Sequence, residues 1–115
     1  NLLNEGVNKM NELYKLFDRV FIEDKSELFN TEYVEMLELK NLLDNSIVTM
    51  HSANFRKESR GAHSHEDYTE RDDENWLIHT IADLNKGDVS ISTRDVIREV
   101  LDSEVESVPL AKRVY

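Results

Sequence analysis

Cysteine is missing from this 115-residue sequence altogether, and proline occurs only once. Without cysteine the chain cannot build a disulfide framework, a thiolate zinc site, a cysteine-ligated iron–sulfur cluster or a cysteine nucleophile. The absence also fits a reducing compartment. No apolar run approaches the roughly 20 residues that a membrane-spanning helix needs, so we expect no direct membrane insertion.

Basic residues are scarce: 14 Lys and Arg stand against 24 Asp and Glu, which gives a formal net charge of −10. A nucleic-acid binder needs clustered Lys and Arg against the phosphates, so we expect no nucleic-acid partner. The same charge argues against adhesion to anionic membrane surfaces. With 39% hydrophobic and 33% charged residues, the chain is polar but globular, and its length suits one domain with a modest core.

Two long helices are predicted in the first half. Apolar residues spaced by three and four form one helical stripe from about residue 2 to 20: Leu3, Val7, Met10, Tyr14, Phe17 and Phe21. A second helix should run from about residue 31 to 57, with Asn30 or Thr31 as its N-cap and neither Pro nor Gly to break it. Its apolar surface is wider than one stripe, so it should pack against more than one partner. The sequence offers only one other clear long helix, so we expect a packing helix to be missing from this chain. The chain also starts without Met on a helical pattern, so we expect a fragment.

The pattern changes after Trp76, where β-branched residues alternate with polar ones. We expect a β-hairpin over about 77–84 and 88–94, joined by the turn residues Asn85, Lys86 and Gly87. Alternatively, the second half passes into a short helix within 93–103, capped by Thr93. The last residues should run extended.

The predicted fold class is therefore mainly α: a spectrin-repeat-like antiparallel helical bundle, its first helix missing, followed by a charged loop and a small C-terminal β-hairpin. The whole chain, 1–115, should form one domain. Its parts are two long helices (1–58), a charged docking loop (59–75), the hairpin (76–96) and a C-terminal tail (97–115).

The centre of the chain, "FRKESRGAHSHEDYTERDDENW" at 55–76, is dense in charges of both signs. Several interpretations compete. A metal site would use His63, His65, Glu66 and Asp67, although His-x-His is a common chance spacing. A catalytic cluster would combine Glu58, Arg60, His63 and Asp67, but neither a nucleophile motif nor a phosphate-binding loop accompanies it. Asp72, Asp73 and Glu74 could bind calcium, but a short helical turn is the simpler interpretation.

The remaining interpretations are a solvated loop and a docking loop. Gly61 lies where the second helix should end. Glycine is favoured at such positions because it readily adopts a positive φ. The arginines among the acids are suited to planar, bidentate contacts at interfaces, and Trp76 is a good anchor. We favour interdomain docking, by these residues: Arg56, Glu58, Ser59, Arg60, Gly61, His63, Asp67, Arg71, Trp76 and Arg113.

Several stretches of the chain resemble one known protein family. "RKESRGAH" (56–63), followed by "EDY" and "ERDDENWLIHT" (70–80), closely resembles the C-terminal region of succinate dehydrogenase flavoproteins, and fumarate reductase flavoproteins are similar there. L-aspartate oxidase shares a shorter version. "FNTEYVEMLELKNLLD" (29–44) and "VPLAKRVY" (108–115) fit the same family, so the resemblance covers essentially the whole chain. His65 stands where the family usually has Arg.

The resemblance implies that the parent enzyme oxidises succinate to fumarate in the citric acid cycle as part of respiratory complex II. It implies FAD in the full-length subunit, bound outside this chain, and electron transfer through an iron–sulfur subunit and membrane-anchor subunits to quinone. No catalytic, cofactor-binding or metal-binding residue carries over, so the chain alone should be inactive. Its charged loop would brace it against the flavin-binding and capping domains, with its charges paired there and largely solvated in the isolated chain.

The expected location of the parent is the cytoplasmic face of a bacterial inner membrane or the mitochondrial matrix equivalent. Two alternatives stay open. One is the same domain from fumarate reductase or L-aspartate oxidase, because the preferred direction of reaction depends on groups outside this chain. The other is a free-standing acidic helical adaptor.

Overall fold

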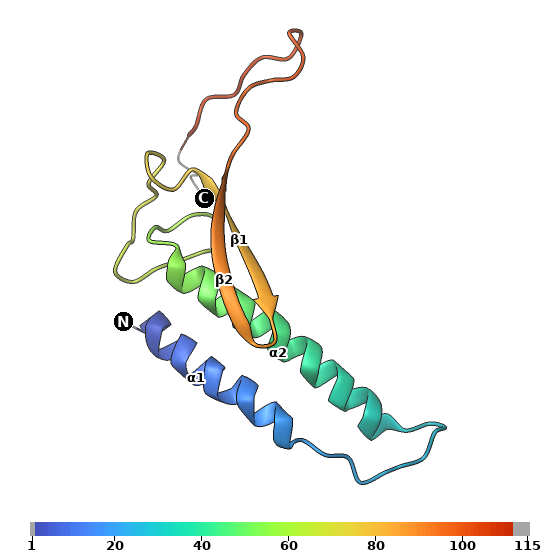
Figure 1. The fold of residues 1–115 in the computed structure, drawn as a ribbon. Helices are drawn as coiled ribbons and strands as arrows, with labels where there is room; N and C mark the ends of the chain where they lie inside the picture. The colour runs from blue at the N-terminus through green and yellow to red at the C-terminus, as the bar shows by residue number, and fades with distance from the viewer. Residues whose placement is uncertain (1, 112–115) are drawn as a thin grey trace.

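The computed structural model describes residues 2–111 as two helices and one hairpin (Figure 1). In chain order these are helix α1 (Leu2–Leu16), the short 3-10 helix η1 (Phe17–Arg19), helix α2 (Thr31–Phe55), and strands β1 (Ile78–Asn85) and β2 (Asp88–Asp95). The fold is thus a mixture of helix and sheet. The two predicted helices and the predicted hairpin are confirmed. The first helix ends at Leu16 instead of about residue 20, with η1 continuing the turn to Arg19, and the other ends lie within two residues of those expected.

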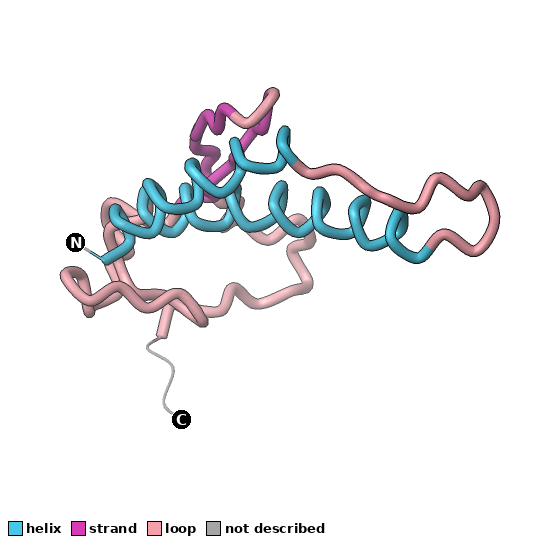
Figure 2. The backbone as a smooth tube through the Cα atoms, turned by 90° about the horizontal axis from the view of Figure 1, so that it is seen from below, coloured by secondary structure: helices cyan, strands magenta, loops and turns pink. Residues whose placement is uncertain are grey.

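Helices α1 and α2 lie side by side and run antiparallel (Figures 1 and 2). They approach closely at Gly6, where an added Cβ would lie 2.9 Å from the sulfur of Met50. The buried apolar residues beside this contact are Val7 on α1 and Ile47 on α2. The apolar stripe predicted on the first helix therefore faces the second helix.

The start of α2 follows from the chemistry of one side chain. Asn30 Oδ1 accepts a hydrogen bond of 2.8 Å from the backbone N–H of Tyr33, which satisfies a donor that the first helical turn leaves open. Glu32 follows in the first turn, where the positive end of the helix dipole favours a carboxylate. Of the two N-caps predicted, Asn30 is the correct one.

Strands β1 and β2 pair in register from Ile78 opposite Asp95 to Asn85 opposite Asp88. The two turn residues both have positive φ, 51° at Lys86 and 91° at Gly87, as a type I′ hairpin turn requires. The alternative of a short helix within 93–103 is wrong. β2 continues to Asp95, and no helix is assigned between there and residue 111.

The turn of the hairpin is held against the helices through Tyr14. A Cβ added to Gly87 would lie 2.8 Å from Cε1 of the Tyr14 ring, so only glycine allows this approach. The Tyr14 hydroxyl donates to Asp44 Oδ1 at 2.7 Å and accepts from Lys40 Nζ at 2.9 Å. One α1 side chain thus fixes α2 and the hairpin together.

The molecule is extended, with a radius of gyration of 19.6 Å and extents of 60 × 38 × 30 Å. A compact domain of this length would have a radius of about 13 Å. Many large apolar side chains are exposed, including Leu42 at 64%, Val34 at 52% and Leu13 at 52%. Contact between α1 and α2 therefore leaves part of the apolar surface of α2 exposed. This agrees with the prediction that the second helix packs against more than one partner.

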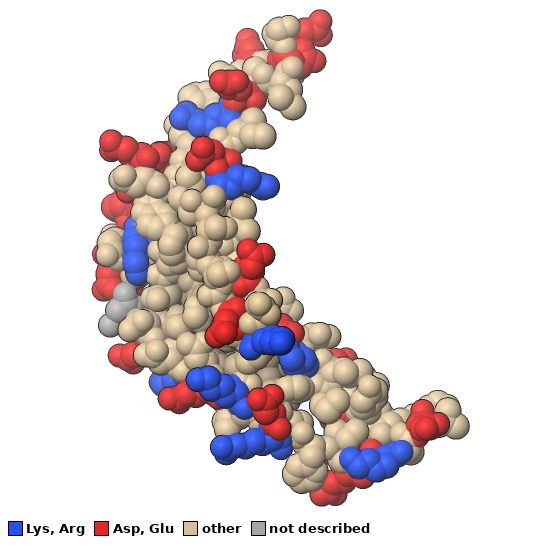
Figure 3. Space-filling model, viewed as in Figure 1, with Lys and Arg blue, Asp and Glu red and all other residues tan. Residues whose placement is uncertain are grey.

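Charges follow the elongated shape. On the face shown in Figure 3, acidic groups mark both tips, with basic groups among them, while much of the middle is uncharged. Among the described residues, neither helix is long and apolar enough to cross a bilayer.

Candidate functional site

The charged segment, residues 56–77, leaves the end of α2 and returns to β1 through two small turns. Arg60 and His63 exchange two backbone hydrogen bonds of 2.9 and 3.0 Å around Gly61, whose φ is 59°. His65 and Tyr68 form a second isolated bridge. Gly61 therefore holds the positive-φ position predicted for it, although in a two-residue turn a few residues beyond the helix end.

Glu58 lies at the centre of this segment and is fully buried, at 0% exposure. Its Oε1 accepts from Nε of Arg56 and Nε of Arg60, each at 2.8 Å. Its Oε2 accepts the backbone N–H of Asp72 at 3.0 Å. One carboxylate thus joins the end of α2, the Gly61 turn and the segment that leads to the hairpin.

Arg56 extends this contact to the start of the hairpin. Its guanidinium donates to the carbonyl oxygen of Ile78 at 3.0 Å, to Thr80 Oγ1 at 3.1 Å and to the carbonyl of Trp76. The same group lies 5.8 Å from the centroid of the Trp76 ring. The ring also meets Phe55 edge-on, at 5.5 Å between centroids. Trp76 is therefore an anchor within this chain, half-buried beneath an arginine.

Arg60 and Arg71 share a second carboxylate, that of Asp73. Arg60 donates to Oδ1 at 2.6 Å and Arg71 to Oδ2 at 2.7 Å. Arg71 also donates to the carbonyl oxygen of Ala111 at 2.7 Å, which ties the last described residue to the charged segment. The charges therefore form a ladder that alternates in sign: Arg56, Glu58, Arg60, Asp73 and Arg71.

The ladder shifts the pKa values of its members. Burial of Glu58 acts to raise the pKa of its carboxyl group, but hydrogen bonds from Arg60, the Asp72 N–H and Arg56 together outweigh it, so the pKa is lowered. The hydrogen bond from Arg60 lowers the pKa of Asp73, and that to Glu58 raises the pKa of Arg60. Glu58 therefore stays ionised and cannot act as a proton donor near neutral pH.

A second cluster lies beside the ladder, around Ser59. The Ser59 hydroxyl accepts the backbone N–H of His65 at 2.9 Å and donates to the carbonyl oxygen of Tyr68 at 2.7 Å. The His65 ring is 2% exposed, and its Nδ1 accepts the Asp67 N–H at 3.1 Å. His65 also meets Tyr68 edge-on at 4.8 Å. This packing fixes the path of the loop.

Asp67 and His63 contribute less than predicted to a shared site. The Asp67 residue is exposed, and its backbone N–H is the group that makes the contact with His65. His63 is half-buried, with Nε2 3.2 Å from the carbonyl oxygen of Arg56. The predicted Arg113 lies outside the described residues. Sequence reasoning missed the bridging role of Asp73 and the burial of His65, because neither spacing nor charge pattern distinguishes them from their neighbours.

One expectation is wrong. The ladder residues were expected to be largely solvated in the isolated chain, but Glu58 is fully buried within it, and the side chains of Arg56 and Arg60 are only 15% and 25% exposed. The reason is that β1 and the Asp72–Trp76 turn fold back over the end of α2. In that turn, Asp72 Oδ1 accepts the N–H groups of Glu74 and Asn75, as the predicted helical turn requires.

The geometry does not favour the metal and catalytic interpretations. Within residues 2–111, no three His, Asp or Glu side chains converge as metal ligands would. Glu58 and Arg60 are occupied by one another, and the Thr80 hydroxyl that contacts the ladder accepts a hydrogen bond from Arg56. The arrangement can brace and align chain segments.

Comparison with known proteins gives consistent results. The family model described as "Fumarate reductase flavoprotein C-term" matches residues 1–115. The chain is 45% identical, over 98% of its length, to a mitochondrial succinate dehydrogenase [ubiquinone] flavoprotein subunit of Oryza sativa subsp. japonica. It is 44% identical, over 99% of its length, to a succinate dehydrogenase flavoprotein subunit of Rickettsia conorii. The chain spans 18% and 19% of these two relatives.

A solved structure resembles the fold as well. A variant of the E. coli quinol fumarate reductase subunit FrdA matches with a TM-score of 0.83 and 40% identity. The match covers 99% of this chain and 19% of that one. The sequence match and the structural match therefore both point to the C-terminal region of a flavoprotein subunit of this family.

Proposed function

The chain belongs to the family of fumarate reductase flavoprotein C-terminal domains, and on this premise we propose that it is the C-terminal domain of a succinate dehydrogenase flavoprotein subunit. The observation that carries the proposal is the agreement along the whole chain with two such subunits at 45% and 44% identity. The domain is a structural module without catalytic residues of its own.

In this proposal the parent enzyme oxidises succinate to fumarate. It passes the electrons through FAD and iron–sulfur clusters to quinone, in complex with an iron–sulfur subunit and membrane-anchor subunits. The complex lies on the cytoplasmic face of a bacterial inner membrane or its mitochondrial matrix equivalent. The relatives' names, flavoprotein subunits of succinate dehydrogenase, support this assignment.

The described residues do not fit the flavin itself. A dinucleotide needs a glycine-rich turn that lets backbone N–H groups approach its phosphates. Gly6 lies within α1 and packs against Met50 of α2, while Gly61 and Gly87 each lie in a two-residue turn. We therefore place FAD outside this chain, which contributes no step of the flavin chemistry.

The docking function rests on exposed apolar surface and on the charge ladder. The side chains of Leu42 and Val34 on α2 are 64% and 52% exposed. A preceding helix would bury them and complete an antiparallel bundle. The ladder from Arg56 to Arg71 holds the charged segment and the tail in one geometry. Such a rigid surface is suited to packing against a flavin-binding domain.

A fumarate reductase parent is the second candidate, favoured by the TM-score of 0.83 to the E. coli quinol fumarate reductase subunit. One experiment separates the candidates. The product of the whole reading frame is purified with its flavinylation machinery, its flavin absorbance is recorded, and dye reduction by succinate is compared with dye oxidation by fumarate. Faster succinate oxidation supports the dehydrogenase, and faster fumarate reduction supports the reductase. A colourless product would refute both.

A further inference from the structure

The last described part of the chain, residues 96–111, leaves the end of β2 and returns to the charged segment. This part is the C-terminal strap. Figure 1 shows it running from the hairpin to one tip of the molecule and back toward the charged segment. Its residues form neither helix nor strand. Regular backbone pairing therefore does not hold the strap in place.

Apolar burial holds the strap only weakly. The side chain of Ile97 is 82% exposed, that of Leu101 98% and that of Val108 89%. Where the two ends of the strap lie side by side, they and Leu77 border a hollow of about 570 Å³ that is open to solvent. Because unfilled space supplies neither dispersion energy nor burial of apolar surface, this contact contributes little to closing the strap.

Hydrogen bonds inside the strap are local. The backbone N–H of Val105 donates to the carbonyl oxygen of Asp102 at 3.1 Å, and the N–H of Glu104 donates to Asp102 Oδ1 at 2.9 Å. Both bonds lie in one turn at the far end of the strap. Within residues 2–111, a single hydrogen bond joins the strap to the rest of the chain: Arg71 Nη1 donates to the carbonyl oxygen of Ala111 at 2.7 Å.

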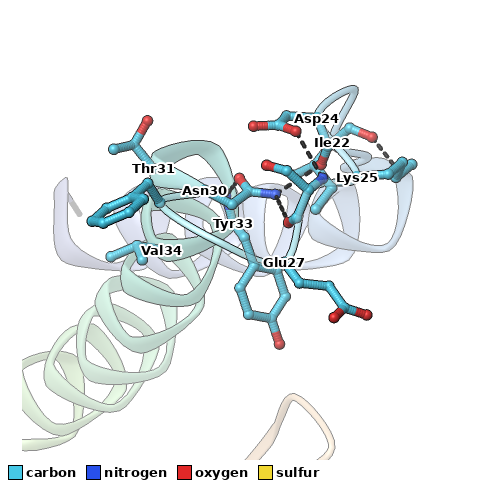
Figure 4. Close-up of a pocket in the computed structure, with 10 residues that line it drawn as sticks. Ile22, Asp24, Lys25, Glu27, Asn30, Thr31, Tyr33 and Val34 are labelled. Carbon is cyan, nitrogen blue, oxygen red and sulfur yellow. Dashed lines mark hydrogen bonds between the residues drawn. The ribbon is translucent and has the colours of Figure 1, made fainter.

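The connection between η1 and α2 is a useful contrast, because several bonds cross it. The Glu32 carboxylate accepts the N–H groups of Glu23 at 3.0 Å and Asp24 at 2.7 Å. Asn30 Nδ2 donates to the carbonyl oxygens of Asp24 at 2.9 Å and Ser26 at 3.0 Å, and Figure 4 shows its side chain reaching across the loop. All of these bonds must break before that loop opens, whereas loss of one bond releases the strap.

The charge ladder sets the direction of the Arg71 side chain. While Nη1 donates to Ala111, Nη2 donates to Asp73 Oδ2 at 2.7 Å. The other oxygen of that carboxylate accepts from Arg60 at 2.6 Å, and Arg60 is fixed in turn by the buried Glu58. Because a guanidinium group is planar and rigid, the bond to Asp73 aims Nη1 of Arg71 at the Ala111 carbonyl.

We propose that Arg71 is the clasp of the C-terminal strap. When its bond to Ala111 breaks, the strap opens as one unit while the helices, the hairpin and the rest of the ladder stay folded. Segments held by few contacts open at a free energy well below that of global unfolding. Asp73 is a positioning residue that acts through Arg71. The inference goes beyond the proposed function, because it concerns this chain alone and holds whichever reaction the parent enzyme catalyses.

The test places two spin labels in the full-length subunit, on cysteines introduced by Glu66→Cys in the charged segment and Ser107→Cys in the strap, in a background without other reactive cysteines. Both positions are exposed. Double electron–electron resonance should give one narrow distance distribution. Arg71→Ala should lose that narrow distribution, because the Ala111 carbonyl then has no donor. Arg94→Ala, at an exposed arginine of β2, is the matched control and should keep it.

A double variant tests whether Asp73 acts through Arg71. Asp73→Asn alone should broaden the distribution, because it frees the guanidinium group that it directs. Arg71→Ala combined with Asp73→Asn should broaden it no further than Arg71→Ala alone, since two residues that act through one contact are not additive. The thermal midpoint of Arg71→Ala should stay close to that of the Arg94→Ala control.

Three results would overturn the proposal. An unchanged narrow distribution in Arg71→Ala would show that other contacts hold the strap. A large fall in the thermal midpoint of Arg71→Ala would show that the strap does not open separately from the fold. Additive broadening in the double variant would show that Asp73 acts independently of Arg71. Because these readouts are distances and thermal midpoints, a wild-type subunit without flavin would refute the proposed function while leaving this test valid.

Discussion

Glu58 Oε1 lies 2.8 Å from Nε of Arg60, two residues further along the chain, and the carboxylate is closed to solvent on every side. The same oxygen accepts from Arg56, on the helix side of Glu58. A single buried anion between two arginines fixes the point where the chain leaves α2. The structure of the whole charged segment depends on this contact.

Removing the charge of Glu58 should destabilise the protein strongly. Glu58→Gln keeps the shape but leaves the guanidinium groups of Arg56 and Arg60 beside a neutral group, and breaking one member of a buried charge cluster costs on the order of 3 kcal/mol. Urea unfolding followed by circular dichroism measures the loss. Glu66→Gln, at an exposed position in the same segment, is the matched control and should change stability little. Equal effects of the two variants would contradict the role of Glu58.

Replacing Gly87 should cost more than replacing Gly61. Both have positive φ, so each Gly→Ala change carries backbone strain of about 1 kcal/mol or more. At Gly61 an added Cβ meets nothing within 4 Å, whereas at Gly87 it would lie 2.8 Å from the Tyr14 ring. The difference in the free energy of unfolding between the two variants measures the clash alone. A Gly87→Ala variant as stable as Gly61→Ala would show that Tyr14 does not hold the hairpin.

Acid should destabilise the fold through carboxylates whose pKa is lowered by their partners. Hydrogen bonds outweigh burial at Glu58, a hydrogen bond from Arg60 acts on Asp73, and one from Lys40 acts on Asp44. A group whose folded pKa lies below its unfolded value, about 4, contributes stability that is complete above that value. This contribution is lost as the pH falls through the folded pKa.

The free energy of unfolding should therefore be steady near neutral pH and fall below about pH 4.5. Urea unfolding at a series of pH values measures the curve. In Glu58→Gln the fall should be shallower, because one of the protonating groups is gone. A parallel curve for this variant would mean that Glu58 has the same pKa in the folded and unfolded states.

The helices and the hairpin could be predicted from the sequence because each depends on local information. Asn30 is a strong N-cap, and the pair Lys86-Gly87 has the chemistry of a tight hairpin turn. The spacing of Val7 and its neighbours gives the buried face of α1. These signals lie within a few residues of the structure that they specify.

The charge ladder could not be predicted in the same way. That Arg60 pairs with both Glu58 and Asp73 depends on how the segment folds back, which a run of mixed charges does not reveal. The burial of His65 likewise follows from Ser59 and Tyr68, which come from the far side of a turn. The sequence therefore predicts a docking loop whose charges are solvated in the isolated chain, whereas long-range folding buries the Glu58 carboxylate within it.

The central claim is that this chain is a domain covered by the rest of a flavoprotein subunit. Leu42→Gln in the full-length subunit tests it most directly, because Leu42 is 64% exposed on α2 here and glutamine preserves the helix. Glu35→Gln, at an exposed acidic position of the same helix, is the control. The account predicts that Leu42→Gln alone lowers the thermal midpoint, from a loss of about 2 kcal/mol of apolar burial, together with the flavin content. A full-length Leu42→Gln subunit as stable and as yellow as the control would contradict it.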